Sequence, residues 1–298
     1  MYKNKILLFG ALLAGIFTAC TNDAEQPLGA QSLQVDVKTA QANTKALVET
    51  SYLPSGSQIG LTVLDANGTN YSGVTYQNVA FTASGSDASQ TWSGASAINL
   101  FLTEGTLYAY YPYSSSVSNI TSVPVNVTTG NDYMYGTPVT GLSATSADAS
   151  ITLNHALAAI RVNTILGDYT GTGAVTSVRI ELGTAQYTTA TMNGKTGALS
   201  SSSGSVTERS QTVSYTMSAS GTATDFLMLP QSTAFDMDIY VTIDGDDYIY
   251  SATGVTLAQG SINTYSLTLN STSSVDLVTR SQADKQGTTT WTTSVEQW

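Results

Sequence analysis

The sequence predicts an all-β protein with a sandwich or barrel architecture. Short runs of alternating apolar and polar residues recur along the chain, and turn residues bound each run. β-Branched residues, tyrosine and glycine dominate, and no long stretch of helix-forming residues follows the first 20 positions. Asn67-Gly68 and Asn193-Gly194 are typical of hairpin turns, because these residues tolerate positive φ. Asp244-Gly245-Asp246-Asp247 separates two runs and predicts a further hairpin. The alternating runs are 59–63, 98–102, 123–127, 178–182, 237–243 and 265–269.

The first 20 residues predict a bacterial lipoprotein signal. Lys3 and Lys5 form a basic start, an apolar stretch of thirteen residues runs from Ile6 to Thr18, and Cys20 ends the segment. This stretch is too short for a membrane-spanning helix, which needs about 20 residues. We therefore expect residues 1–19 to be removed as a signal peptide and Cys20, the only cysteine, to carry lipid. The alternative is an ordinary signal followed by a buried free cysteine.

Composition excludes several classes of partner and of stabilising bond. Without residues 1–19, which carry two lysines and no acidic residue, the formal charge falls from -11 to -13. Such an acidic chain has no concentrated cationic face for nucleic acid. A single cysteine cannot form a disulfide within the chain, so stability must come from apolar cores and sheet hydrogen bonds.

A polar segment, residues 20–45, follows the predicted signal. It contains one alternating run, in which Leu33, Val35 and Val37 share a face. A run of this kind could add an edge strand to a sheet.

Two β-domains are expected beyond this segment. We assign an N-terminal domain to residues 46–167 and a C-terminal domain to residues 174–298. The segment between them, 167–173, is rich in glycine, polar and without alternation, as domain boundaries often are. The tail 271–298 retains strand-forming residues and two tryptophans, which disordered tails usually lack.

Several segments resemble the fimbrillin family, the subunits of type V pili on the outer membrane of certain Gram-negative anaerobes. The first is the signal that ends in Cys20. The second is the sequence at 132–136, followed by the His-Ala-Leu-Ala strand within 151–162. The third is the glycine-to-tyrosine strand within 260–269, and Trp291 is similar to a tryptophan often found in the last strand.

The resemblance implies two tandem transthyretin-like β-sandwiches with Greek-key connections, made as a lipid-anchored precursor at the outer membrane. In the family, a secreted trypsin-like protease cuts after a basic residue and removes the N-terminal strand. The corresponding bond in this chain is Lys45–Ala46, where family members usually have arginine. The exposed groove then accepts a strand from the next subunit, and in shaft subunits the C-terminal segment is the donor.

Strand removal and replacement also follow from sheet chemistry. Loss of an edge strand leaves unpaired backbone groups and an apolar slot, which another chain can fill by β-augmentation. A head-to-tail contact of this kind does not close on itself, so it produces a filament. The predicted displaced strand carries Leu33, Val35 and Val37. The candidate donor residues are Val275, Leu277, Trp291 and Val295. The alternative is that the tail completes the second sandwich of its own chain.

We recognise no constellation for catalysis, cofactor binding or a metal. His155 is the only histidine and lies in an apolar run, where a buried structural histidine is expected. One histidine beside a lipidated cysteine cannot assemble a zinc site, and the acidic turn 244–247 lacks the further ligands of a calcium loop. We therefore expect a structural pilus subunit and not an enzyme. The alternative is a lipid-anchored adhesin or pilus tip protein that binds glycans or host proteins. Its candidate sugar platform is Tyr108, Tyr110, Tyr111 and Tyr113.

Overall fold

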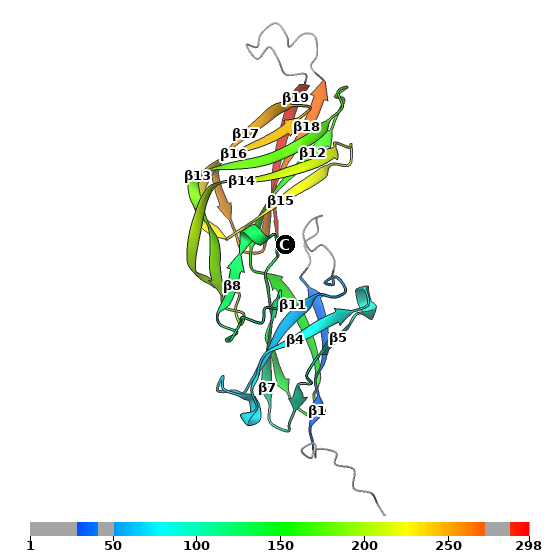
Figure 1. The fold of residues 1–298 in the computed structure, drawn as a ribbon, viewed down its shortest axis with the longest axis vertical. Helices are drawn as coiled ribbons and strands as arrows, with labels where there is room; N and C mark the ends of the chain where they lie inside the picture. Colours follow the sequence, from blue (N-terminus) through cyan, green and yellow to red (C-terminus); the bar gives the residue numbers. More distant parts are fainter. Residues whose placement is uncertain (1–28, 41–50, 272–286, 298) are drawn as a thin grey trace, which may run out of the picture.

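The computed structural model describes residues 29–40, 51–271 and 287–297. Nearly all regular structure in this part of the chain is β-strand, which confirms the predicted all-β class. The helical segments are the short 3₁₀ turns η1 (Tyr71–Gly73), η2 (Asp87–Ser89) and η3 (Val127–Thr129). The molecule is elongated, with an N-terminal lobe at one end and a C-terminal lobe at the other (Figure 1).

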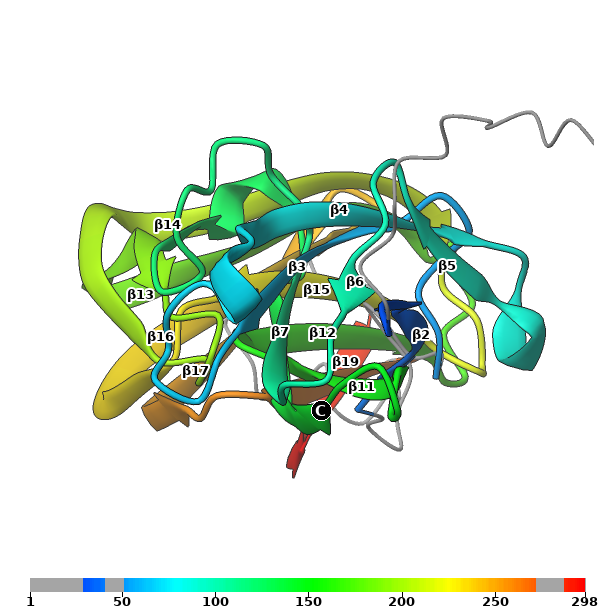
Figure 2. The same cartoon turned by 90° about the horizontal axis from the view of Figure 1, so that it is seen from below.

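The N-terminal lobe is built around one curled sheet. Its strand order is β2-β11-β9-β7-β3-β4-β5, with β10 also paired to β7, and the small pair β1-β6 lies apart from it. The strands are β1 (Gln31–Ser32), β2 (Gln34–Thr39), β3 (Gln58–Leu64), β4 (Tyr76–Ser84), β5 (Thr91–Gly94), β6 (Asn99–Leu100), β7 (Gly105–Tyr111), β9 (Met134–Gly136), β10 (Val139–Leu142) and β11 (Asp148–His155). Because the sheet curls, its edge strands β2 and β5 approach each other (Figure 2). Ile59, Leu107 and Leu153 lie fully buried inside the curl.

The C-terminal lobe consists of two sheets packed face to face. One has the order β15-β12-β18-β19, and the other has the order β14-β13-β16-β17 with β8 also paired to β13. The strands are β8 (Val123–Asn126), β12 (Ala158–Leu166), β13 (Ala174–Met192), β14 (Leu199–Thr216), β15 (Thr222–Met228), β16 (Gln231–Ile243), β17 (Asp246–Leu257), β18 (Ser261–Ser271) and β19 (Gly287–Gln297). Ile160, Phe226, Ile239 and Leu267 form part of the core between the sheets.

The change from one lobe to the other lies at Ala156 and Leu157, and not at the glycine-rich segment 167–173 where we expected a domain boundary. β11 belongs to the N-terminal sheet, whereas β12 pairs with β15 and β18 in the C-terminal lobe. Ala156 and Leu157 are completely buried in a third apolar cluster between the lobes. The crossover is therefore made of core residues, and segment 167–173 is only the turn from β12 to β13. The transthyretin-like connectivity implied by the resemblance stays a prediction.

Most of the alternating runs form strands where the sequence predicts them. The runs at 59–63, 123–126, 178–182, 237–243 and 265–269 lie on β3, β8, β13, β16 and β18, and Val127, which ends the second run, begins the turn η3. The run at 98–102 is an exception, because only Asn99–Leu100 forms a strand and Leu102 is 72% exposed. The Asn193-Gly194 and Asp244-Gly245 turns connect β13 to β14 and β16 to β17, as predicted.

Candidate functional site

The edge strand β2 closes the core of the N-terminal lobe. It pairs in parallel with β11 over its whole length, with Val37 directly opposite Ile151. Leu33 and Val37 are 5% and 1% exposed, and Val35 is half-buried against the same core. The intervening residues of β2 point to solvent, so the strand has the alternation that the sequence predicts.

Both ends of β2 are held by further backbone hydrogen bonds. At the start, the Leu33 N–H donates to the Ile98 carbonyl at 2.9 Å. At the other end, the Thr39 N–H donates to the Ser51 carbonyl at 3.0 Å, and the Ala40 N–H donates to the Leu153 carbonyl at 2.7 Å. Between these ends, β2 has a sheet partner on one side only within the described part of the chain.

The core-facing side chains of β11, the strand that pairs with β2, are apolar. Ala149, Ile151 and Leu153 are 3%, 2% and 0% exposed, and they lie opposite Val35, Val37 and Thr39 of β2. A chain without β2 would expose this row together with an unpaired backbone edge. Burying one Leu or Val side chain contributes about 1.5–3 kcal/mol, so this slot would bind an apolar strand strongly.

A narrow groove runs beside β2, between it and β5. Val35, Trp92 and Ala149 lie among its lining residues. β2 and β5 approach each other here without pairing, since each is an edge strand of the curled sheet. This groove could not be predicted from the sequence, because Trp92 lies in a polar segment without a clear hydrophobic period.

The tail strand β19 forms the far edge of the C-terminal sheet. It pairs antiparallel with β18 along its whole length, with Trp291 opposite Leu267. The Trp291 ring stacks on Tyr250 at a centroid distance of 5.0 Å and an interplanar angle of 22°. Val295 is 67% exposed, so Trp291 is the apolar side chain by which the described tail packs on the lobe. In this structure the tail therefore completes the sheet of its own chain, which is the alternative to strand donation stated above.

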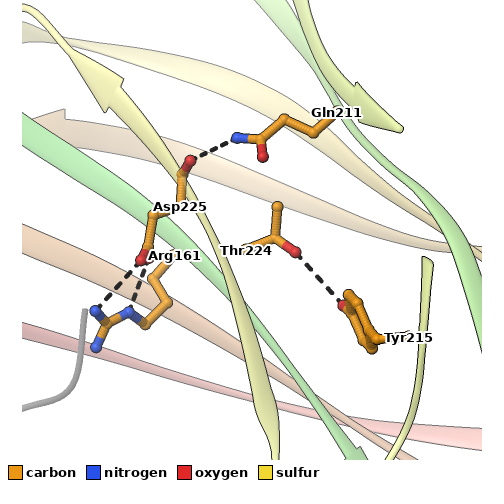
Figure 3. Close-up of polar contacts among 5 residues, drawn as sticks. All are labelled: Arg161, Gln211, Tyr215, Thr224 and Asp225. Atoms are coloured by element: carbon orange, nitrogen blue, oxygen red, sulfur yellow. Dashed lines mark hydrogen bonds and ion pairs between the residues drawn. The ribbon is translucent and has the colours of Figure 1, made fainter. Parts of the chain in front are cut away.

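The opposite edge of the same sheet, β15, is covered by side chains of β14 (Figure 3). The Gln211 amide donates to the Asp225 carbonyl at 2.6 Å, and the Arg209 guanidinium donates to the Leu227 carbonyl at 3.1 Å. Arg161 on β12 forms an ion pair with the Asp225 carboxylate at 2.8 Å. These contacts occupy two carbonyls of β15, so the β18–β19 edge is the better candidate for exchange of a strand.

The fimbrillin-like family matches residues 44–298 of the chain. The chain belongs to this family. It is a family of structural pilus-type proteins of the cell surface and not one of enzymes. The match begins beside the predicted cut at Lys45–Ala46, so β1 and β2 of this fimbrillin-like protein lie outside it. No curated protein matches the chain.

Solved structures share the fold of this fimbrillin-like protein at low sequence identity, and each of the three described here carries a provisional name as a cell adhesion protein. The one from Bacteroides uniformis is 19% identical with a TM-score of 0.66, and the match covers 92% of this chain and 100% of that one. The one from Bacteroides ovatus is 16% identical with a TM-score of 0.63, covering 90% and 98%. The one from Bacteroides fragilis is 11% identical with a TM-score of 0.55, again covering 90% and 98%. At these identities, the likeness establishes the fold alone.

Several predicted site residues of the fimbrillin-like protein lie outside the described residues. They are Cys20, Lys45, Ala46, Val275 and Leu277. Within the described ranges, no helix is long and apolar enough to cross a membrane.

His155 is a buried structural residue, as its apolar run predicts. Its Nδ1 lies 2.7 Å from Oδ2 of Asp132, and the two side chains are 0% and 5% exposed. Burial raises the pKa of the Asp132 carboxyl, and the hydrogen bond with His155 offsets part of that rise. The pair lies where β11 ends at the boundary between the lobes, so it can fix the loop before β9 against β11.

The four tyrosines of the candidate sugar platform do not form one exposed surface. Tyr110 is completely buried, and its hydroxyl donates to Oδ1 of Asn78 at 2.6 Å. The Lys195 ammonium lies over the Tyr108 ring, 4.9 Å from its centroid. Tyr111 faces the other side of β7 and packs against the N-terminal core. This separation weakens the case for stacking a sugar on these rings.

Asp244 in the acidic turn holds the start of β13. Its carboxylate accepts hydrogen bonds from the Gly173 N–H at 2.8 Å, the Ala174 N–H at 2.9 Å and the Tyr169 hydroxyl at 2.9 Å. Burial acts to raise the pKa of Asp244, but the backbone donors Ala174 and Gly173 outweigh it and lower the pKa. Desolvation and the neighbouring Asp244 raise the pKa of Tyr169 to about 12. No group of three or more metal-ligating side chains forms within the described ranges.

Replacing Asp244 by asparagine should lower the free energy of unfolding by less than about 1 kcal/mol at pH 7, because a charged acceptor is lost but the side chain is exposed and solvent screens its charge. The folded-state pKa of Asp244 is depressed, so its contribution is present above the unfolded value of about 3.9. The contribution is lost as the pH falls through the folded-state pKa. Urea unfolding at pH 7 and near pH 3 checks this. Asp246→Asn is the matched control, and an Asp244→Asn effect that does not shrink in acid would contradict the assignment.

Proposed function

We propose that this fimbrillin-like protein is a structural subunit of a cell-surface pilus that assembles by donor-strand exchange. In this proposal the chain reaches the outer membrane as a lipoprotein acylated on Cys20. A trypsin-like protease then cuts after Lys45, β2 leaves its slot, and the tail of another subunit takes its place. The partners are therefore other pilus subunits in head-to-tail contact, outer-membrane lipid and the protease.

The observation that carries the proposal is the position of β2. This strand is an integral part of the N-terminal core, yet it lies entirely before the proposed cut. The hydrogen bond between Thr39 and Ser51 brings the two described ends around the cut side by side. Cleavage between them would separate β2 from the rest of the chain without breaking any described strand. After cleavage, β2 would be held only by hydrogen bonds and apolar contacts, and another strand can replace both.

The two edge strands differ in a way that supports the direction of exchange. Leu33, just before β2, and Val37 within it are almost completely buried, whereas Val295 of β19 is largely exposed and Trp291 is only partly buried. Withdrawing β19 from its own edge therefore exposes few of its apolar side chains. The slot left by β2 would bury the apolar side chains of an incoming strand more completely. In the sequence, Val275 and Leu277 supply a further alternating pair in the tail.

Mild trypsin treatment of the purified, unlipidated precursor tests the proposal. We expect a cut after Lys45, a stable fragment that begins at Ala46, and filaments in negative-stain micrographs. A variant truncated after Ser271 should be cut in the same way and remain monomeric, with thermal unfolding used to verify that it is folded. A folded precursor that resists cleavage at Lys45, or cut wild-type protein that stays monomeric at high concentration, would refute this assembly route.

The second candidate function is a lipid-anchored adhesin or pilus tip protein. It is favoured by the position of β19, which completes its own sheet, because a tip subunit does not need to donate its tail. The truncation after Ser271 separates the two functions. It removes assembly from a shaft subunit but leaves the ligand binding of an adhesin intact.

A further inference from the structure

The wall of the slot that faces β2 carries two buried polar atoms without a hydrogen-bond partner. Trp92 on β5 is 8% exposed, and its Nε1 donor is unpaired. Oε1 of Gln90 is also buried and unpaired, although the Nε2 of the same side chain donates to the Leu53 carbonyl at 2.6 Å. Buried donors and acceptors in folded proteins nearly always have partners, and each unpaired one carries a desolvation penalty.

Both residues line the groove between β2 and β5. The groove is bounded on the other side by β2 itself, through Gln34, Val35 and Asp36. Thus β2 lies close to Trp92 and Gln90 but satisfies neither of the two atoms. Gln90 and Trp92 are two residues apart in the sequence, at the unpaired edge of strand β5. A donor and an acceptor on two such neighbouring side chains can match the carbonyl and N–H groups of an extended polypeptide backbone.

The lengths of the strands identify a better occupant. β11 has eight residues, and β2 pairs with six of them, Asp148–Leu153. β19 has eleven residues, and of its side chains at 290–295 only Trp291 is partly buried where the strand now lies. A tail of this length can pair with the whole of β11 and continue past the point where β2 ends.

We propose that Trp92 and Gln90 form a recognition site for the donor strand of a second copy of this chain. The donor backbone presents a carbonyl oxygen to the Trp92 Nε1–H and an N–H to the Gln90 Oε1. β2 is then a placeholder that fills the apolar slot but leaves these two groups unpaired. Pairing them makes the exchanged state more favourable than the precursor, which gives the exchange its direction. This inference rests on the proposed strand exchange.

Trp92→Phe is the variant that tests the site, because it keeps an aromatic ring and removes the N–H together with two ring carbons. The wild type and the variant both receive a specific protease site within residues 41–50, so the test does not depend on cleavage at Lys45. After cutting, a fluorescently labelled peptide of residues 271–298 is added at a protein concentration too low for filaments. Fluorescence anisotropy gives the dissociation constant of the peptide.

We expect the peptide to bind Trp92→Phe about fivefold more weakly than wild type, which corresponds to the loss of one neutral hydrogen bond. The melting temperature of the uncut precursor should fall only by what the lost ring volume costs, because the Trp92 Nε1 has no hydrogen-bond partner there. Equal peptide affinity in both proteins would overturn the recognition site and leave strand exchange standing. A cut wild type that takes up no peptide would overturn both the site and the proposed exchange.

Discussion

Replacing Val37 by aspartate is expected to destabilise the uncut precursor by about 3–5 kcal/mol and to leave assembled filaments unaffected. Val37 is 1% exposed and lies opposite Ile151, so the new carboxylate would be buried without a partner. In the filament that we propose, β2 has been replaced, and residue 37 is no longer part of the subunit. Urea unfolding of the unlipidated precursor and denaturant-induced dissociation of filaments measure the two effects.

Two matched variants make this prediction specific. Lys38→Asp introduces the same carboxylate one residue further on, where the side chain is 54% exposed, and should change stability by less than about 1 kcal/mol. Ile151→Asp alters the floor of the slot, which is present before and after exchange, so it should weaken precursor and filament alike. If Val37→Asp prevents folding, Val37→Ala gives the same comparison with a loss of about 2 kcal/mol. Filaments weakened by a change at Val37 would show that β2 stays in the assembled subunit.

The sequence predicted which faces of the strands are buried better than it predicted which strands are neighbours. In the runs at 59–63 and 237–243, alternation alone identifies Ile59 and Ile239 as core residues, since side chains point to opposite faces of a strand in turn. The same argument identified the inward face of β2. It could not identify β11 as its parallel partner, because this contact joins residues more than a hundred positions apart.

The errors have equally local causes. The boundary at 167–173 was inferred from glycine content, but the chain crosses between lobes at Ala156 and Leu157, which look like ordinary core residues in sequence. Leu102 continues an alternating run, yet the strand ends at Leu100 and leaves Leu102 exposed. The unpaired Trp92 Nε1 could not be predicted at all, since it depends on how closely two sheet edges approach.

A disulfide between β2 and β11 is expected to abolish assembly of the cut protein, and a reducing agent should restore it. Asp36 and Ser150 lie directly opposite each other, and both side chains are exposed. Adjacent strands are about 4.8 Å apart, which is within the Cα separation that a disulfide can span. The variant Asp36→Cys/Ser150→Cys is made in unlipidated protein without Cys20, so no other thiol competes. Filament formation after proteolysis is followed by light scattering and electron microscopy.

The control places an equivalent cross-link where it cannot hold β2. Ser84 and Thr91 are opposite each other on β4 and β5, both exposed, and the variant Ser84→Cys/Thr91→Cys should assemble whether oxidised or reduced. The disulfide between β2 and β11 prevents β2 from leaving the sheet, and it increases the stability of the folded protein. A block that reduction reverses therefore cannot be attributed to misfolding. Equal assembly of the oxidised Asp36→Cys/Ser150→Cys variant would mean that subunits join through another surface, with β2 still in its slot.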